Sequence, residues 1–474
     1  MELKRFFGKA AGVAVLSAAG LLFTQGTARA ETLADALASA YNTSGLLEQN
    51  RALLRAADEN VPQALSALRP IISWSASASR TFGETASATS GYALVGTESG
   101  SASLSLSAQI LLYDGGASRI GVEIAKESVL ATRQSLVAVE QQILLRAASA
   151  YLEVLRAQAF LDLRQNNLRL LTQELRAAKD RFEVGEVTRT DVSLAEARLA
   201  ASRSNLATAQ GTLAQARLEY LTAVGHEPGS LSPVRALTGL PATADAAAAL
   251  ALRQHPALLQ ARYQVNVAEL RIAVADAALS PSVSLSGSLS LSRNFYNDGR
   301  SQTGTISLGA SQPIYSGGSL SSLQRQAHQN RDAARSGLHV TAGDIRQNVG
   351  NAIATRQLLR ASYESSQQQV RAAQLAFQGV REEATLGART TLDVLNAEQE
   401  LLDARANLIS SEIDQLVAGY SLLSAMGELT AQKLKLKVRT YDPAGYYNMV
   451  KDGPAGLSKQ GRQLDRVLRG LQKE

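Results

Sequence analysis

Residues 117–182 read ASRIGVEIAKESVLATRQSLVAVEQQILLRAASAYLEVLRAQAFLDLRQNNLRLLTQELRAAKDRF, and this stretch decides the fold. It holds 66 residues with no proline and one glycine, Gly121, and apolar residues recur through it at helical spacing. At 1.5 Å per residue, a single helix of this length is about 100 Å long. Because helices in globular proteins average about 11–12 residues, the stretch predicts a coiled coil or a tube of helices rather than one compact domain.

The chain contains two such long helices, and the same motifs surround each of them. A Tyr-x-Gly-Gly motif precedes the first long helix and also a second one, predicted from 319 to about 385. Gly115 and Gly317 of the two motifs are 202 residues apart, and so are Gly185 and Gly387, which follow the two helices. Two markers at one offset predict an internal duplication. We therefore divide the mature chain into a first repeat at 31–240, a second repeat at 241–430 and a C-terminal periplasmic tail at 431–474.

The first thirty residues have the pattern of a secretory signal peptide. A basic start precedes a short apolar segment at 10–23, and Ala28-Arg29-Ala30 forms an Ala-x-Ala cleavage site. We expect a signal peptide at 1–30 and a mature chain from Glu31. Its removal lowers the formal net charge from +6 to +3, so the charge gives no reason to expect a nucleic-acid partner. The chain has no cysteine and therefore no disulfide and no lipid-anchor thiol after the signal.

Between the helices the period of the apolar residues changes to two. Serine alternates with apolar residues at 71–79 and 101–110, and again at 282–291 and 305–311. Each pair of segments predicts a β-hairpin with strands of about ten residues, and the nine extra residues of the first copy are expected in its tip. This alternation is typical of a sheet between lipid and water, although a soluble sheet with one solvated face is an alternative.

The remaining helices are predicted to be about half as long, and they lie at 33–67, 190–224, 245–278 and 391–426. Pro62 is a candidate kink in the first of them. Since two half-length helices match one long helix, we expect 190–224 to continue into 245–278, and 33–67 to pair with 391–426. The linker 225–244 then lies halfway along the rod. One chain supplies four helical columns and four strands, and the tail after Pro443 is expected to be loose.

Nearly the whole mature chain, about 33–440, resembles the TolC family of outer-membrane channel proteins. The resemblance rests on the duplicated plan, the Tyr-x-Gly-Gly junctions and two tip motifs, 181–192 and 386–395. It implies an α+β membrane protein, in which a trimeric 12-stranded transmembrane β-barrel continues into a long 12-helix periplasmic α-barrel. The implied partners are two further copies, a periplasmic adaptor (membrane fusion protein), an inner-membrane ABC or proton-driven transporter, and outer-membrane lipid.

The resemblance also predicts a latch at the tips. Thr190 and Asp191 match positions that bond an arginine of the other hairpin, here Arg389, and hold the entrance closed. An arginine–carboxylate pair suits a latch, because it is directional and breaks readily in solvent. Helix capping is the alternative explanation for Thr190 and Asp191. The family's aperture tyrosine falls on Ala384, so we expect a looser latch than in members that keep it.

Two further roles follow from the resemblance. Asp393 matches an acidic ring inside the entrance, which would favour cations, and Asn396 stands where the family has a second acidic ring, so the constriction is expected to be less negative. The ends of the rods that lie farthest from the strands are expected to meet the adaptor. These docking residues are Val184, Gly185, Glu186, Leu386, Gly387 and Ala388.

The sequence contains no pattern that predicts catalysis. Its four histidines have no metal-ligand spacing, and His255-Pro256 is expected to mark the first turn of a helix. We predict a non-enzyme without cofactor or metal, a passive outer-membrane exit duct for type I protein secretion, small-molecule efflux or both. The tail at 441–447 resembles the ending of members that serve type I secretion. A periplasmic or outer-membrane scaffold or adhesin, with helical stalks and no pore, is the alternative.

Overall fold

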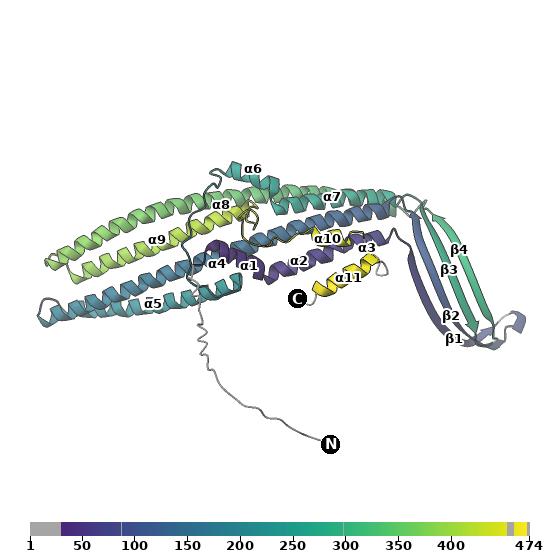
Figure 1. The fold of residues 1–474 in the computed structure, drawn as a ribbon, viewed down its shortest axis with the longest axis horizontal. Helices are drawn as coiled ribbons and strands as arrows, with labels where there is room; N and C mark the ends of the chain where they lie inside the picture. Colours follow the sequence, from purple (N-terminus) through teal and green to yellow (C-terminus); the bar gives the residue numbers. More distant parts are fainter. Residues whose placement is uncertain (1–29, 87, 297, 453–458, 472–474) are drawn as a thin grey trace, which may run out of the picture.

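Two helices of 67 residues run through most of the molecule. The computed structural model describes residues 30–86, 88–296, 298–452 and 459–471, so the predicted signal peptide lies outside it apart from Ala30. Helix α4 spans Ala117–Glu183 and helix α8 spans Ser319–Thr385. Helices α5 (Arg189–Val224) and α9 (Thr391–Ala425) return along them from the outer tips. The predicted bounds of all four helices are confirmed to within one residue, and the turns that join α4 to α5 and α8 to α9 lie at the opposite end of the molecule from the sheet (Figure 1).

The sheet has four antiparallel strands in the order β1-β2-β3-β4. The first hairpin pairs β1 (Ile71–Ala86) with β2 (Leu94–Tyr113), and the second pairs β3 (Ser282–Asn294) with β4 (Arg300–Ser311). The predicted strand length of ten is too short for the first hairpin. Its extra residues extend the ladder to the pair Ala86 and Leu94 rather than forming only a loop.

The half-length helices are more broken than predicted. The segment 33–67 forms α1 (Leu33–Thr43), α2 (Gly45–Asp58) and α3 (Asn60–Ser66), with Pro62 in the first turn of α3, where a missing N–H costs nothing. Extended Ser44 ends α1 and caps α2, since its side chain accepts from the Leu47 N–H.

The segment 245–278 is likewise two helices, α6 (Ala244–Gln254) and α7 (Pro256–Ala277). His255 adopts an extended backbone, and its side chain accepts a hydrogen bond from the Ala257 N–H while Pro256 opens α7. The residue before a proline is disfavoured in the helical region, so the chain breaks there. His255-Pro256 does mark a first turn, but that of a second helix.

The predicted pairing of the half-length helices is wrong, although the linker does lie midway along the rods. The end of α5 meets α1, where the Val224 carbonyl accepts from the Thr43 hydroxyl at 2.9 Å and the Ser39 hydroxyl at 3.0 Å. The end of α9 meets α7, with Gly427 against His255. Helix lengths alone fit both pairings, and the linker 225–243 carries the chain across to α6, which packs on α8.

The largest hydrophobic core lies at this midway level, which we call the equator. There α4 buries Leu144, Tyr151 and Leu152 completely, together with Tyr220 at the end of α5 and Leu422 in α9. The Tyr151 hydroxyl lies 2.8 Å from the Glu31 carbonyl and 2.7 Å from the Ser232 carbonyl. The Tyr220 hydroxyl donates to the Glu31 carboxylate at 2.7 Å. Glu31 also forms a parallel bridge with Leu231, so the segment that precedes α1 is fixed to the linker.

The prediction that the tail is loose after Pro443 is wrong for the residues that follow directly. Helix α10 (Gly445–Val450) packs on α2, and the Tyr446 hydroxyl donates to Glu59 Oε1 at 2.6 Å. Helix α11 (Lys459–Leu471) follows. Among the helices that the structure describes, none combines the length and the apolar character needed to cross a membrane.

Candidate functional site

The turns that join α4 to α5 and α8 to α9, which we call the tips, are built alike. After α4, Gly185 adopts φ +80° and the Glu186 N–H bonds the Arg181 carbonyl at 2.9 Å. After α8, Gly387 adopts φ +78° and the Ala388 N–H bonds the Glu383 carbonyl at 2.9 Å. These are left-handed helix ends, for which glycine is favoured because it has no Cβ. A Cβ at either position would meet nothing within 4 Å, so the backbone angle rather than crowding requires glycine.

A capping box starts each return helix. Thr188 caps α5, because its hydroxyl accepts from the Asp191 N–H while its own N–H donates to Asp191 Oδ2 at 2.9 Å. Thr390 and Asp393 repeat the arrangement at α9. Hydrogen bonds from Thr188 hold the pKa of Asp191 below its ordinary value, and those from Thr390 do the same for Asp393. The capping explanation is thus confirmed for Asp191, but Thr188 rather than Thr190 is the cap.

The two tips enclose a hollow of about 940 Å³. Asp191 lines it from one hairpin and Arg389 from the other, whereas Thr190 is exposed and does not line it. Within this chain the Arg389 Nε donates to Glu383 Oε2 at 2.8 Å. Among the described residues it makes no bond to Asp191 or Thr190, so the structure brings Asp191 and Arg389 to one hollow without joining them and leaves Thr190 outside it.

The outermost tip residues are accessible and partly apolar. Val184 is 70% exposed and Leu386 is 85% exposed, and Gly185, Glu186, Gly387 and Ala388 are exposed as well. Apolar side chains this open at the end of a rod lack an internal packing role in the single chain. All six predicted docking residues therefore lie on one accessible end of the molecule, which Figure 1 shows as the ends of the α4–α5 and α8–α9 hairpins.

A polar cluster inside the rods was missed by the sequence reasoning. Glu398 of α9 is only 4% exposed, and its Oε1 accepts from Asn167 Nδ2 of α4 at 2.9 Å. The Ser202 hydroxyl of α5 donates to Asn167 Oδ1 at 3.0 Å, so three helices share this cluster. Burial raises the pKa of Glu398 to about 7, with neighbouring Glu174 adding to the effect. A signal was present, since Glu398 occupies the same apolar helix face as Val394 and Leu401.

Asn396 of α9 lies beside the same helices. It is exposed, and its Oδ1 accepts from Arg198 Nη2 of α5 at 3.1 Å, so this position links the two hairpins rather than standing free. Nothing in the described part of the chain resembles a catalytic or metal centre, and no group of three or more potential ligands is gathered there.

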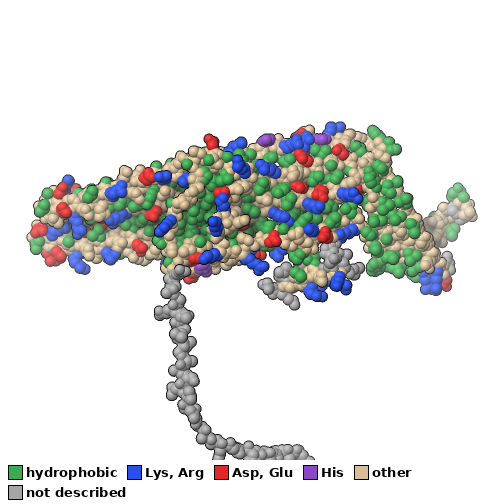
Figure 2. Space-filling model, turned by 45° about the horizontal axis from the view of Figure 1, so that its top comes forward, with side chains coloured by type: hydrophobic (Ala, Val, Ile, Leu, Met, Phe, Trp, Pro, Cys, Tyr) green, Lys and Arg blue, Asp and Glu red, His purple; other side chains and the backbone are tan. Residues whose placement is uncertain are grey.

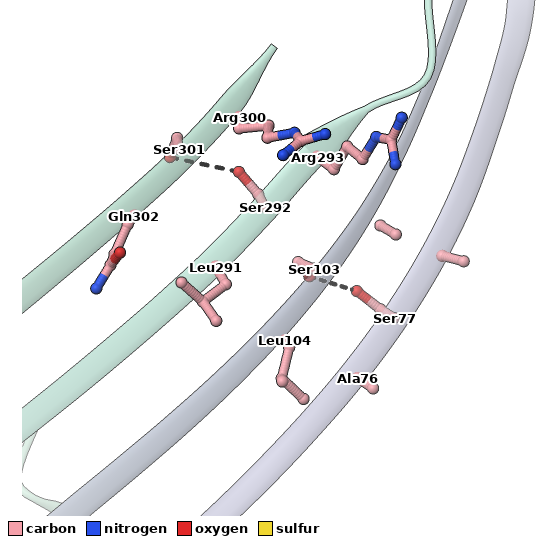
Figure 3. A pocket seen from close by; sticks show the side chains of 12 residues that line it. Ala76, Ser77, Ser103, Leu104, Leu291, Ser292, Arg293, Arg300, Ser301 and Gln302 are labelled. Atoms are coloured by element: carbon pink, nitrogen blue, oxygen red, sulfur yellow. Dashed lines mark hydrogen bonds between the residues drawn. The ribbon is translucent and has the colours of Figure 1, made fainter. Parts of the chain in front are cut away.

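The sheet forms a second candidate surface, because its register sorts side chains by face. Ser77, Ser103, Ser292 and Ser301 follow one another across the four strands, and the hydroxyls of Ser77 and Ser103 lie 2.8 Å apart (Figure 3). The row on one side of it is also serine and threonine, and on the other side Ser79 and Ser101 are followed by Asn294. The opposite face carries apolar side chains such as Trp74, and the visible surface of the sheet in Figure 2 is mainly hydrophobic. One face thus suits water and the other suits lipid.

A sheet with one hydroxyl face and one apolar face, carried on helical rods with matched tips, defines the class of outer-membrane export channels. The model of the family described as outer membrane efflux protein matches residues 28–226 and 247–428, and the chain belongs to this family. The predicted resemblance is thereby confirmed. The protein is accordingly an outer-membrane protein that extends into the periplasm, and its family is one of channels rather than of enzymes.

Individual proteins agree with this assignment. The chain is 37% identical over 442 residues to the outer membrane efflux protein BepC of Brucella suis, which covers 92% of this chain and 94% of BepC. It is 28% identical over 327 residues to the outer membrane protein TolC of Vibrio cholerae, covering 66% and 74% of the two chains. The solved structure of the Campylobacter jejuni CmeC outer membrane channel matches with a TM-score of 0.72 at 17% identity, over 87% of each chain, and supports the fold.

Proposed function

We propose that this chain is one subunit of a homotrimeric exit duct, passive in itself, through which a periplasmic adaptor and an inner-membrane transporter export their cargo. The observation that carries the proposal is the sorting of the sheet into a hydroxyl face and an apolar face, directly continuous with the helical rods. Such a sheet can line water and face lipid at once. The repeats at 31–240 and 241–430 would each contribute one hairpin of strands.

Open edges on both halves of the subunit support the trimer. In the sheet, β1 and β4 each have one unpaired edge. In the rods, α5 packs on α4, α4 on α9 and α9 on α8, which leaves α5 and α8 at the two margins. Unpaired strand edges favour further pairing, and head-to-tail addition of copies closes a ring. Four strands are too few to enclose a lumen, whereas three copies supply twelve strands and twelve helical columns.

The margins of the rods also carry apolar side chains that the single chain leaves uncovered. Leu358 and Leu375 of α8 are 66% and 70% exposed, and Leu218 of α5 is 64% exposed. Neighbouring copies would bury these side chains against each other.

The trimer is tested on detergent-extracted protein by native mass measurement, with and without heating. We expect a stable trimer that dissociates only on heating, and a stable monomer in unheated detergent would contradict the proposal. Planar-bilayer recording then separates a duct from the alternative of a scaffold or adhesin. Trimers that insert without conducting would favour the scaffold.

Efflux of small molecules is the cargo class that we favour, because BepC, 37% identical along 92% of the chain, is described as an efflux protein. The tail motif that suggested type I protein secretion has a structural use in this chain, since Tyr446 bonds Glu59 and the Tyr441 N–H donates to the Tyr41 hydroxyl. Deletion of the gene should raise sensitivity to several unrelated toxic compounds. Unchanged sensitivity with loss of a secreted protein would favour secretion.

The accessible tips are proposed as the adaptor contact. Val184→Asp and Leu386→Asp place a charge at the two most open apolar tip positions without altering the backbone angles of Gly185 and Gly387. We expect both variants to form trimers in the outer membrane and to lose export, whereas the matched change Val184→Leu keeps it. Export at the normal level in both aspartate variants would contradict the contact.

The latch is proposed to form between neighbouring hairpins in the closed trimer, with Arg389 exchanging Glu383 for Asp191 and Thr190. One solvated pair contributes only about 0–1 kcal/mol, but three copies acting together shift a closed–open equilibrium by one or two decades. Arg389→Ser and Asp191→Ala should each raise single-channel conductance, and the double variant should add little. Glu383→Gln is the control, because it frees Arg389 and should leave the entrance closed. Equal conductance in the wild type, the two single variants and the double variant would show that the tips do not latch.

Asp393 is proposed to have a role separate from the latch. The three copies in the trimer would place a ring of carboxylates at the entrance, nearer the tip than Asn396. Asp393→Ala should leave the resting conductance nearly unchanged, lower the preference for cations and weaken block by multivalent cations. Asn396→Ala is the neutral comparison. Unaltered selectivity in the Asp393 variant would restrict this residue to capping α9.

A further inference from the structure

Three arginines gather where the four-stranded part of the sheet ends, on the side away from the rods, while the β1–β2 hairpin continues beyond them. Arg293 and Arg300 lie directly opposite each other on β3 and β4, and their row continues as Ala102 and Ala78 on the other strands. Arg80 is the next residue of β1 on that same face. Figure 3 shows Arg293 and Arg300 on adjacent strands, and basic side chains gather at this end of the sheet in Figure 2. Strand pairing therefore collects three guanidinium groups on the apolar face.

Contacts within the chain do not account for this cluster. Like charges directly opposite each other in a sheet are destabilising, so the pair Arg293 and Arg300 works against the fold. Arg293 meets Asp298 at 3.3 Å and Arg80 meets Glu98 at 3.2 Å, but both ion pairs are exposed and therefore weak. Arg300 has no carboxylate partner among the described residues. The arrangement points to an anion from outside the chain.

The height of the cluster shows where that anion would lie. Arg293 comes ten residues after Val283, which starts the apolar face of β3. At about 3.4 Å per residue and a tilt of about 40°, the two positions are roughly 26 Å apart along the membrane normal. The lipid-facing apolar band of outer-membrane sheets is about 25 Å tall. The arginines therefore sit at its outer edge, at the level of lipid headgroups.

Aromatic side chains mark the same level. Phe82 is 75% exposed next to Arg80 on the apolar face, and Tyr296 is 49% exposed with its hydroxyl on Glu98 Oε2 at 3.0 Å. Exposed aromatic rings that carry or adjoin a polar group are enriched where hydrocarbon meets headgroups. Two kinds of side chain, basic and aromatic, thus indicate one boundary.

We propose that Arg80, Arg293 and Arg300 form a binding site for the phosphate groups of an anionic lipid in the outer leaflet. Arginine presents a planar fork of N–H donors that matches two phosphate oxygens, and it is less strongly hydrated than lysine. Arg80 is on β1 and Arg293 on β3, two strands and one same-face row apart, which is about 12 Å, so the site spans more than one phosphate. The site rests on the proposed outward orientation of the apolar face.

The test uses the detergent-purified oligomer and lipid A, with its phosphates present or enzymatically removed, as the probe. Native mass measurement should show lipid A bound to the wild type, at least tenfold weaker binding to Arg293→Gln/Arg300→Gln, and equally weak binding of the dephosphorylated probe. Arg203→Gln/Arg217→Gln, two exposed arginines of α5, is the matched control and should bind as the wild type does. Arg293→Lys/Arg300→Lys keeps the charge, should assemble normally and should bind with an intermediate affinity.

Undiminished binding of lipid A by the glutamine variant would overturn the site, and so would equal binding of the dephosphorylated probe. If the glutamine variant binds lipid A normally but has a changed ion selectivity in planar bilayers, the arginines face the lumen. That result would overturn the proposed outward orientation of the apolar face. Failure of the wild type itself to form a heat-labile oligomer would instead contradict the proposed trimer. Inorganic phosphate at millimolar concentration should not displace the lipid, and displacement would show a free-phosphate site.

Discussion

The equator and the tip half of the rods use the same helices in opposite ways. At the equator α4 buries Leu144, Tyr151 and Leu152 completely, against side chains from α1, α5 and α9. Toward the tips the apolar contacts shrink to two small clusters, around Phe377 and around Leu171, and a carboxylate enters the interior. Dense apolar packing fixes one arrangement, whereas exposed ion pairs such as that of Arg389 with Glu383 at the tip break and re-form at low cost. The difference locates rigidity at the equator and adaptability at the entrance.

The largest change in the free energy of unfolding is expected from a substitution that opens a cavity at the equator. Leu152→Ala removes a fully buried side chain and should lower the free energy of unfolding by about 3 kcal/mol, whereas Leu171→Ala in the tip half should cost about half as much, since its site collapses more easily. Both positions are in α4, so helix propensity changes equally in the two variants. Thermal unfolding of the purified protein, followed by circular dichroism, measures both. Equal shifts of the midpoint would abolish the distinction between the two regions.

A smaller change in stability, which depends on pH, is expected from the substitution of Glu398. Because burial raises the pKa of this carboxyl from 4.5 to about 7, the folded protein holds the proton more tightly than the unfolded chain. The stability contributed by Glu398 is therefore full below about pH 4.5 and is lost as the pH rises through 7. Glu398→Gln should stabilise the protein by about 1–2 kcal/mol at pH 8 and change little at pH 4. Thermal midpoints at both pH values test this.

The exposed neighbour Glu400 supplies the control for that experiment. Glu400→Gln should leave the pH dependence as it is in the wild type. If both glutamine variants behave alike, the pH dependence originates elsewhere, and the tip half is no more pH-sensitive than the equator.

The smallest effect is expected from the caps of the return helices. Thr188→Ala removes the hydroxyl that accepts from the Asp191 N–H and should cost about 1 kcal/mol, confined to the first turn of α5. Thr190→Ala lies two residues further on and should cost almost nothing. Hydrogen exchange of amides in the first turn of α5 measures the local opening. Equal exchange in the two variants would mean that the tip is held by something other than its cap.

Features with local causes could be read from the sequence. The long helices begin after glycines that adopt left-handed angles, Gly116 and Gly318, and no proline interrupts them, so their bounds were predictable. The strand faces followed from a period of two. The breaks at Ser44 and His255 were not predicted, because a short uninterrupted apolar pattern does not show where a side chain will cap a new helix.

Features that depend on tertiary contact could not be read in the same way. The burial of Glu398 requires Asn167, 231 residues away in the chain, and the choice of Glu383 as partner of Arg389 depends on the turn geometry of the tip. Helix lengths fitted two pairings of the half-length helices, and only the contacts at their ends, Val224 with Thr43 and Gly427 with His255, decide between them. The exposure of the six proposed docking residues, by contrast, was predictable as a group, since any hairpin exposes its turn.

The bridge between Glu31 and Leu231 has a consequence for the order of folding. Glu31 is held by Tyr151, Tyr220 and the linker, which follow it by 120, 189 and 200 residues, so the full set of partners is present only after some 200 further residues have been delivered. The N-terminal segment must therefore wait, unfolded, while the first β-hairpin and both helices of the first repeat emerge. Contacts of such long sequence separation form late and slowly. A chain arriving in the periplasm thus exposes α1 as an unprotected segment for the longest time, and this segment is where a chaperone would be needed most.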